Sequence, residues 1–290
     1  MGATRPPLLL PLAVLAVALA GVSFGSIFVR LAAAPALAIA LWRMTFASAV
    51  ALPVAAGTGT LRPSRVRREW LLAAVAGVLL ALHFGTWITS LRYTSVAASV
   101  LLVNTAPVFV ALLGWMTGRR PSAATWASVV LATAGAAVIA VDGLGGGDSL
   151  TGDLLALGGA LAMACYLMLA REAQRGLGYL PYIGITYASA ALVLWVAVLA
   201  SGTPWSGFSA RTWSVLLAMA AVSQLVGHGG YNWSLRHLQP AFVAVALAGE
   251  PVVASWLAWW LLGEPLSWRV AAGGLLVVSG IVVAVRAAGR

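Results

Sequence analysis

The sequence has very little of what keeps a protein dissolved in water. Only 8% of its 290 residues are charged, lysine is absent and seven residues are acidic, whereas 62% are hydrophobic. The mean hydropathy is +0.98. A soluble domain needs a polar surface that this composition cannot supply, so we expect the chain to lie almost wholly in a lipid bilayer.

Several chemistries are excluded by what is missing. The single Cys165 allows no intramolecular disulfide and leaves the redox compartment open. The sequence has neither metal-ligand spacing nor a phosphate-binding loop, so no metal and no cofactor is expected. Seventeen arginines give a net charge of +10, but they stand singly or in short loops. We therefore expect them to orient the chain in the membrane and not to bind nucleic acid.

What is present is a series of ten apolar stretches. Each is close to the length of about 20 residues that crosses the hydrocarbon core of a bilayer. Polar segments with glycine or proline separate them, as is typical of helix ends. The predicted spans are 8–29, 35–56, 70–91, 95–117, 121–141, 152–171, 180–200, 211–235, 239–262 and 267–286.

The chain is also duplicated. Gly85 and Gly229 are 144 residues apart, and the same offset aligns many other identical residues. A duplicated unit with an odd number of spans inserts in opposite senses, which is the plan of many secondary transporters. We predict an all-α membrane fold of ten transmembrane helices, built as two inverted five-helix repeats, 1–145 and 146–290, around a central cavity. Further aligned pairs are Ser90 with Ser234, Leu91 with Leu235, Arg92 with Arg236, Ala97 with Ala241, Pro107 with Pro251, Val108 with Val252, Leu113 with Leu257, Trp115 with Trp259, and Pro121 with Pro265.

The placement of the arginines predicts the orientation. With ten spans, twelve arginines fall on the side of the two termini and four on the opposite side. Because cytoplasmic loops carry the excess of positive charge, we expect a multi-pass protein of the cell (inner) membrane with both termini in the cytoplasm. The twelve are Arg5, Arg62, Arg65, Arg67, Arg68, Arg119, Arg120, Arg171, Arg175, Arg236, Arg286 and Arg290, and the four are Arg30, Arg92, Arg211 and Arg269.

The first apolar stretch has a rival interpretation. Arg5, the apolar run from Leu8 and the Ala18-Leu19-Ala20 triplet resemble a cleavable signal sequence. The apolar run continues to Val29, however, and its removal would leave nine spans and break the repeat. We interpret it as an uncleaved first helix.

One segment carries a family resemblance. Residues 247–267 read LAGEPVVASWLAWWLLGEPLS and resemble the ninth-helix signature of EamA-type transporters of the drug/metabolite transporter superfamily. GDLLAL at 152–157 and LWRM at 41–44 look like further family marks, and the similarity covers essentially the whole chain. The resemblance implies ten helices around a cavity through which small metabolites move, often outward. The first repeat departs from it, because Ala106 stands where the second repeat has Glu250, so a symmetric pair of proton-coupling carboxylates is absent.

Two charged residues stand inside predicted spans. Glu250 lies near the bilayer midplane and is followed by Pro251, which removes a backbone donor and loosens the helix. An acid at this depth can carry a proton or bind a cationic group, or it can be a structural acid paired with an arginine. Arg43 lies in the second span, where a substrate carboxylate is one possible partner, and a fixed bridge to Glu250 or helix-end carbonyls is the structural alternative.

Uncharged polar and aromatic residues complete the predicted site. His83 and His228 occupy nearly matching repeat positions and can relay protons or bind substrate, although a histidine in a bundle is often only a packing residue. Asn104 can hydrogen-bond to a ligand or to backbone carbonyls, and a hydrogen bond to another helix is the structural alternative. Most of the thirteen tryptophans fall near span ends, as interfacial residues do. The remaining candidates for substrate binding or coupling are Trp42, Trp87, Met163, Tyr166, Tyr231 and Asn232.

These features favour a carrier, since the spans offer too few aligned polar residues for a channel pore. We expect it to bind small amphiphilic metabolites, most plausibly amino acids or related compounds for export, with Arg43 for a carboxylate and Glu250 for an amine. Efflux of drugs or quaternary-ammonium and other organic cations is the closest alternative. A monomer would suffice, a dimer remains possible, and coupling to protons is open.

An enzyme is the remote alternative. Residues 21–25 match the Gly-x-Ser-x-Gly pattern of a nucleophile elbow, so an intramembrane hydrolase could use Ser23, His83 and Glu250. The motif falls within a helical span, where its glycines more simply allow another helix to approach closely. We therefore expect no enzymatic activity.

Overall fold

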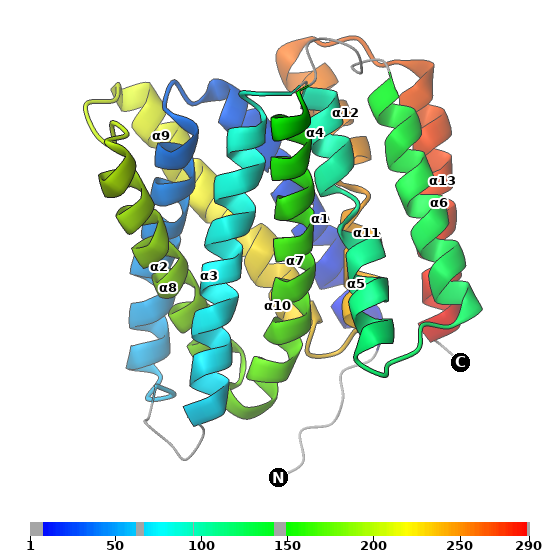
Figure 1. Cartoon of the computed structure of the whole chain (residues 1–290), viewed down its shortest axis with the longest axis horizontal. Helices are drawn as coiled ribbons and strands as arrows, with labels where there is room; N and C mark the ends of the chain where they lie inside the picture. The colour runs from blue at the N-terminus through cyan, green and yellow to red at the C-terminus, as the bar shows by residue number, and fades with distance from the viewer. Residues whose placement is uncertain (1–7, 62–66, 95, 142–148, 289–290) are drawn as a thin grey trace.

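The computed structural model describes residues 8–61, 67–94, 96–141 and 149–288, and within them the chain is a bundle of helices (Figure 1). The helices are Leu9–Leu31 (α1), Ala36–Gly57 (α2), Arg67–Ser90 (α3), Val96–Val103 (α4), Ala106–Met116 (α5), Ala123–Ala140 (α6), Leu150–Leu177 (α7), Tyr179–Ser201 (α8), Ala210–Ala218 (α9), Met219–His228 (η2), Gly229–Ser234 (α10), Pro240–Leu247 (α11), Glu250–Leu262 (α12) and Trp268–Ala288 (α13).

The ten predicted spans are all helical in the described part of the chain. Nine helical stretches there are long and apolar enough to cross a membrane. The tenth, predicted at 211–235, consists of α9, η2 and α10, which follow one another without a break. Its middle ten residues, Met219–His228, form a π-helix, a conformation that the apolar pattern does not predict. The prediction of an all-α, ten-helix membrane fold is confirmed.

Two spans are interrupted halfway at equivalent places. The fourth is divided into α4 and α5 at Asn104 and Thr105, and the ninth into α11 and α12 at Ala248 and Gly249. In each case a proline stands at the second position of the following helix, where its missing N–H costs no intrahelical bond. The breaks are one repeat offset apart, since α5 begins at residue 106 and α12 at residue 250. Discontinuous helices of this kind place helix termini at the midplane of a transporter.

The packing follows the inverted repeat. Helix α3 packs against α7, and the repeat-related α1 packs against η2; α2 pairs with α8, and α6 pairs with α13. Small residues permit these close contacts. A Cβ atom added to Gly21 of α1 would lie 3.0 Å from the backbone of Gly227 in η2. Such backbone proximity is typical of helix association in membranes.

The two ends of the bundle differ in charge. Helix α1 begins and α13 ends on the same side of the bundle (Figure 1). Four of the arginines predicted for that side, Arg5, Arg62, Arg65 and Arg290, lie outside the described residues, as does the predicted repeat boundary at 145 and 146. The described arginines of that side still outnumber those opposite by eight to four. We call the two ends the terminal side and the opposite side.

Candidate functional site

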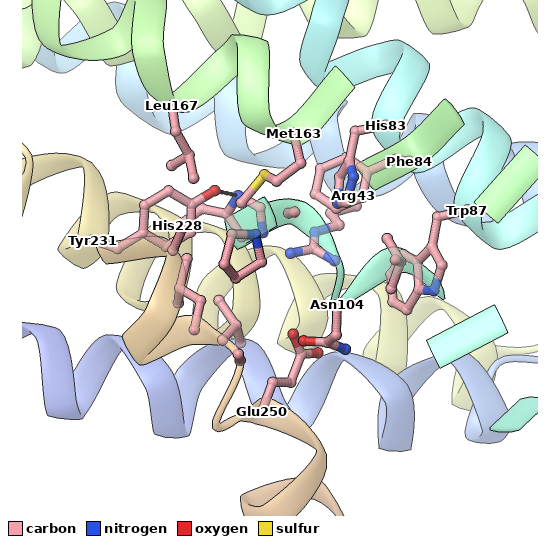
Figure 2. Close-up of a pocket in the computed structure, with 17 residues that line it drawn as sticks. Arg43, His83, Phe84, Trp87, Asn104, Met163, Leu167, His228, Tyr231 and Glu250 are labelled. Atoms are coloured by element: carbon pink, nitrogen blue, oxygen red, sulfur yellow. Dashed lines mark hydrogen bonds between the residues drawn. The ribbon is translucent and has the colours of Figure 1, made fainter. Parts of the chain in front are cut away.

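A cavity lies between the two interrupted spans (Figure 2). Residues from both repeats surround it, including both helix breaks, and most of its wall is apolar or aromatic. Its lining consists of Val22, Arg43, His83, Phe84, Trp87, Val103, Asn104, Ala106, Pro107, Met163, Leu167, His228, Tyr231, Ala244, Leu247, Ala248 and Glu250.

Arg43 is a buried cation with fixed orientation. Its side chain is only 2% exposed. Nε donates to Oε1 of Gln224 at 2.8 Å and Nη2 donates to the backbone oxygen of Ser223 at 3.4 Å, both in η2. The guanidinium carbon lies 4.1 Å from the centre of the Phe84 ring, within the range of a cation–π contact. These contacts fix the Arg43 guanidinium in place. Its remaining N–H groups face the cavity (Figure 2).

Glu250 faces the same cavity from the other break. It is the first residue of α12, where the unpaired N–H groups of a helix start favour a carboxylate. No hydrogen bond or ion pair joins its carboxylate to another described residue, and it is not within ion-pair distance of Arg43. The fixed Arg43–Glu250 bridge, one structural alternative raised by the sequence, is therefore not formed. The carboxylate points into the cavity toward Arg43 (Figure 2).

The two histidines both contact the ring of Phe84. Phe84 is 4.9 Å from His83 and 5.1 Å from His228, measured between ring centroids. Nδ1 of His83 lies 2.9 Å from the carbonyl oxygen of Gly159, so that nitrogen carries the proton and Nε2 is left as an acceptor. Nδ1 of His228 hydrogen-bonds to the Tyr231 hydroxyl. Each histidine thus has one nitrogen occupied by the protein.

Trp87 and Asn104 differ in what they can offer a ligand. The Trp87 ring stacks on His83, with centroids 6.0 Å apart and planes at 16°. Its indole N–H is enclosed and has no hydrogen-bond partner among the described residues. Asn104 donates to the carbonyl oxygen of Val100 at 2.9 Å, one turn earlier in its own span, and not to another helix as the structural alternative expected; the residue also borders the cavity.

Eight of the eleven predicted site residues line the cavity; the other three do not. Asn232 and Tyr166 lie behind the wall, fully buried, and the Asn232 amide donates to the Tyr166 hydroxyl at 2.5 Å. Trp42 belongs instead to an aromatic cluster at the opposite side, where its indole N–H donates to the Trp205 carbonyl at 2.6 Å and its ring contacts Trp213. The structure does not bring these three side chains to the cavity lining.

Two residues that shape the site, Gln224 and Phe84, are not among those predicted from the sequence. Gln224 orients Arg43, and Phe84 covers its guanidinium. A signal for Gln224 was present, because an amide in the middle of an apolar span needs a partner. Phe84 had none, since one more aromatic residue in a hydrophobic helix is indistinguishable from packing.

The hydrolase alternative receives no geometric support. Residues 21–25 lie inside the regular helix α1, not on a strand-to-helix turn. The Ser23 hydroxyl is buried and donates to the backbone oxygen of Leu19 at 2.7 Å. Neither His83 nor Glu250 contacts it in the described structure. The glycines of the motif serve the close packing of α1 on η2.

Comparisons with known proteins agree with this architecture. The model of the EamA-like transporter family matches twice, over residues 8–141 and 150–286. An uncharacterized transporter of Archaeoglobus fulgidus is 26% identical over 231 residues, which cover 77% of this chain and 78% of that protein. An uncharacterized transporter of Clostridium kluyveri is 21% identical over 201 residues, covering 67% and 65%. One solved crystal structure, whose title names no function, superposes with a TM-score of 0.81 at 18% identity, over 96% of this chain and 98% of that one.

Proposed function

The chain belongs to the EamA-like transporter family, and from this premise we propose that it is an alternating-access carrier of small zwitterions such as amino acids. The observation that carries the proposal is the pair of opposite charges, Arg43 and Glu250, which border one cavity without an ion pair between them.

The chemistry of the cavity supports a zwitterion. A substrate carboxylate can accept from the unused N–H groups of Arg43, and a substrate ammonium can donate to the unpaired carboxylate of Glu250. The apolar wall between them, formed by residues such as Phe84 and Met163, accommodates a side chain. A bound zwitterion would neutralise both buried charges, which is the requirement that such charges impose inside a membrane.

The openings of the bundle support an inward-facing state. A cavity of about 990 Å³ lies on the terminal side, lined by the ends of α5, α7 and α13 among others. On the opposite side, Arg30 at the end of α1 forms an ion pair with Glu264, in the segment between α12 and α13. Rocking of the repeats would open the opposite side and close the terminal side.

We further propose the placement of the carrier in the cell. The excess of described arginines on the terminal side supports an inner-membrane protein with both termini in the cytoplasm. In that orientation the inward-facing state loads from the cytoplasm, as an exporter does. One chain contains both repeats, so a monomer suffices for transport. Glu250 is the candidate for proton coupling, because a substrate ammonium and a proton would compete for the same carboxylate.

Export of organic cations is the second candidate. The aromatic rings of Phe84, Trp87 and Tyr231 border the cavity together with Glu250. Aromatic faces and a single carboxylate are the usual means of binding a quaternary ammonium group. Arg43 argues against organic cations as substrates, because its positive charge repels a cation that has no carboxylate.

Thermal stabilisation of the purified protein tests the two candidates against each other. A ligand that binds the folded state raises the melting temperature. The zwitterion assignment predicts stabilisation by amino acids of suitable size, lost in Arg43→Gln, and none by tetraalkylammonium salts. Stabilisation by the ammonium salts alone, lost in Glu250→Gln, would transfer the assignment to cation efflux.

A further inference from the structure

A large cavity at the terminal side is lined by basic side chains. Its volume is about 990 Å³, and no aspartate or glutamate is among its described lining residues. We call it the basic vestibule. It is defined by five arginines, Arg119, Arg120, Arg171, Arg175 and Arg236.

Three parts of the chain bring these arginines together. Arg119 and Arg120 lie in the short connection between α5 and α6, Arg171 and Arg175 in the last turns of α7, and Arg236 in the connection between α10 and α11. Nη1 of Arg171 donates to Oε1 of Gln239 at 2.6 Å, which ties α7 to the latter connection. The cluster is therefore built from both repeats.

The positive charge of the vestibule is only partly compensated. Glu172 lies beside it and pairs with Arg175 at 2.7 Å and with Arg119 at 3.8 Å. Neither Arg120 nor Arg236 forms an ion pair with a described residue. Partial burial, with a smaller contribution from the Arg236 charge, lowers the pKa of His237, which also lines the vestibule, and so disfavours its charged form. The positive charge of the vestibule therefore comes from its arginines.

The cluster is not repeated in the other half of the chain. Moved by the repeat offset of 144, four of the five arginines correspond to residues that are not basic, and only Arg236 corresponds to an arginine, Arg92. Orientation in the membrane also does not require it, because arginines can orient a chain from any loop on the cytoplasmic side. Arg67, Arg68 and Arg286 lie on the terminal side without lining the vestibule. The four non-basic counterparts are Gly263 for Arg119, Glu264 for Arg120, Ile27 for Arg171 and Leu31 for Arg175.

We propose that the basic vestibule is a binding site for anionic groups, carboxylates or phosphates, on the terminal side of the bundle. A concave surface of one charge with apolar walls concentrates counter-ions. Guanidinium groups bind carboxylate and phosphate oxygens in pairs of parallel hydrogen bonds. Arg120 and Arg236 are the residues free to do so. The site does not depend on which solute the central cavity carries, because it lies outside that cavity and uses different residues.

Citrate binding to the full-length protein in a neutral detergent tests the proposal. Thermal unfolding is followed over a series of sodium citrate concentrations, with sodium chloride holding the ionic strength constant. The test variant is Arg120→Gln with Arg236→Gln. The matched control is Arg92→Gln with Arg211→Gln, which removes two charges from the opposite side. A third variant, Arg120→Lys with Arg236→Lys, keeps the charge.

The expected result is that citrate stabilises the wild type and the control equally. In the glutamine test variant the concentration needed for half the effect rises roughly tenfold or more, and the lysine variant retains part of the binding. A second arm compares nanodiscs of phosphatidylglycerol and phosphatidylcholine. Stabilisation by phosphatidylglycerol without any by citrate, again lost only in the test variant, would identify the anion as a lipid headgroup. If neither citrate nor phosphatidylglycerol distinguishes the test variant from the control, the proposal is overturned.

Discussion

Gln224 accepts a hydrogen bond of 2.8 Å from Nε of Arg43, and this bond joins α2 of the first repeat to η2 of the second. Arg43 is therefore oriented across the repeat interface. Gln224 lies within the π-helical segment, an arrangement often found at functional sites. A relative movement of the repeats would alter the position of the cation that we assign to the substrate carboxylate.

Replacing Gln224 tests this positioning role. In Gln224→Leu the Nε–H group of Arg43 loses its acceptor, and a hydrogen bond to a charged group contributes about 1.5–3 kcal/mol. We expect KM for an amino acid to rise roughly tenfold or more in proteoliposomes, with a smaller change in kcat. Gln224→Glu restores an acceptor but neutralises Arg43, so it should recover thermal stability without recovering KM. A Gln224→Leu protein that loses thermal stability but keeps the wild-type KM would assign Gln224 a purely structural role.

The contact between α1 and η2 predicts a steric effect on stability. A Cβ atom at position 227 would lie 2.7 Å from the backbone nitrogen of Val22. This clash can be relieved only if α1 or η2 shifts, because backbone atoms cannot rotate away as a side chain can. Gly227→Ala should lower the free energy of unfolding by about 1–3 kcal/mol, the usual cost of overpacking. Gly158→Ala in α7 is the control, because no atom lies within 4 Å of the added carbon. Equal melting temperatures of the two variants would refute the close approach.

The ion pair on the opposite side predicts a shift between conformations. The side chains of Arg30 and Glu264 are 42% and 47% exposed, so solvent screening limits the pair to about 1 kcal/mol or less. Glu264→Ala should therefore increase the outward-open fraction by about fivefold at most. The measurement is labelling of Ala244→Cys, in a Cys165→Ser background, by an impermeant thiol reagent added outside the cell. Arg30→Glu combined with Glu264→Arg should return labelling to its original level, and unchanged labelling in Glu264→Ala would exclude a role for the pair in closure.

The arginine distribution predicts the location of both termini. Reporter enzymes active only in the cytoplasm should be active when fused at either end. Fusions in the connections after α1 and after α7 provide the contrast, since these lie on the opposite and the terminal side. Activity at one terminus but not at the other would contradict an even number of spans.

The sequence predicts the fold better than it predicts the site, for physical reasons. Apolar length and the repeat reveal the ten spans, because both are properties of the linear chain. The π-helix at 219–228 has no such signature, since its residues would suit an ordinary apolar helix equally well. Pro251 indicated where the ninth span loosens, yet not that this span and the fourth are both interrupted next to their prolines.

Site residues were predictable where their burial itself is costly. Arg43 and Glu250 stand out because a charged side chain inside a membrane is energetically costly and is usually paired or functional. Trp42 and Asn232 were chosen for their chemistry alone, and which way each points depends on the rotation of its helix against its neighbours. That rotation is set by packing, so the aromatic cluster around Trp42 and the hydrogen bond from Asn232 to Tyr166 become visible only in three dimensions.

The most direct measurement of the central claim is amino-acid counterflow in proteoliposomes containing the wild type, Glu250→Gln or Glu69→Gln. Glu69 lies in the first turn of α3, far from the cavity lining, and serves as the matched control. The account predicts that Glu250→Gln folds with an unchanged yield but loses nearly all counterflow. A neutral amide cannot form an ion pair with the substrate ammonium, whose charge is then uncompensated inside the membrane. Counterflow at the wild-type rate in a well-folded Glu250→Gln protein would contradict the assignment of Glu250 to the transport site.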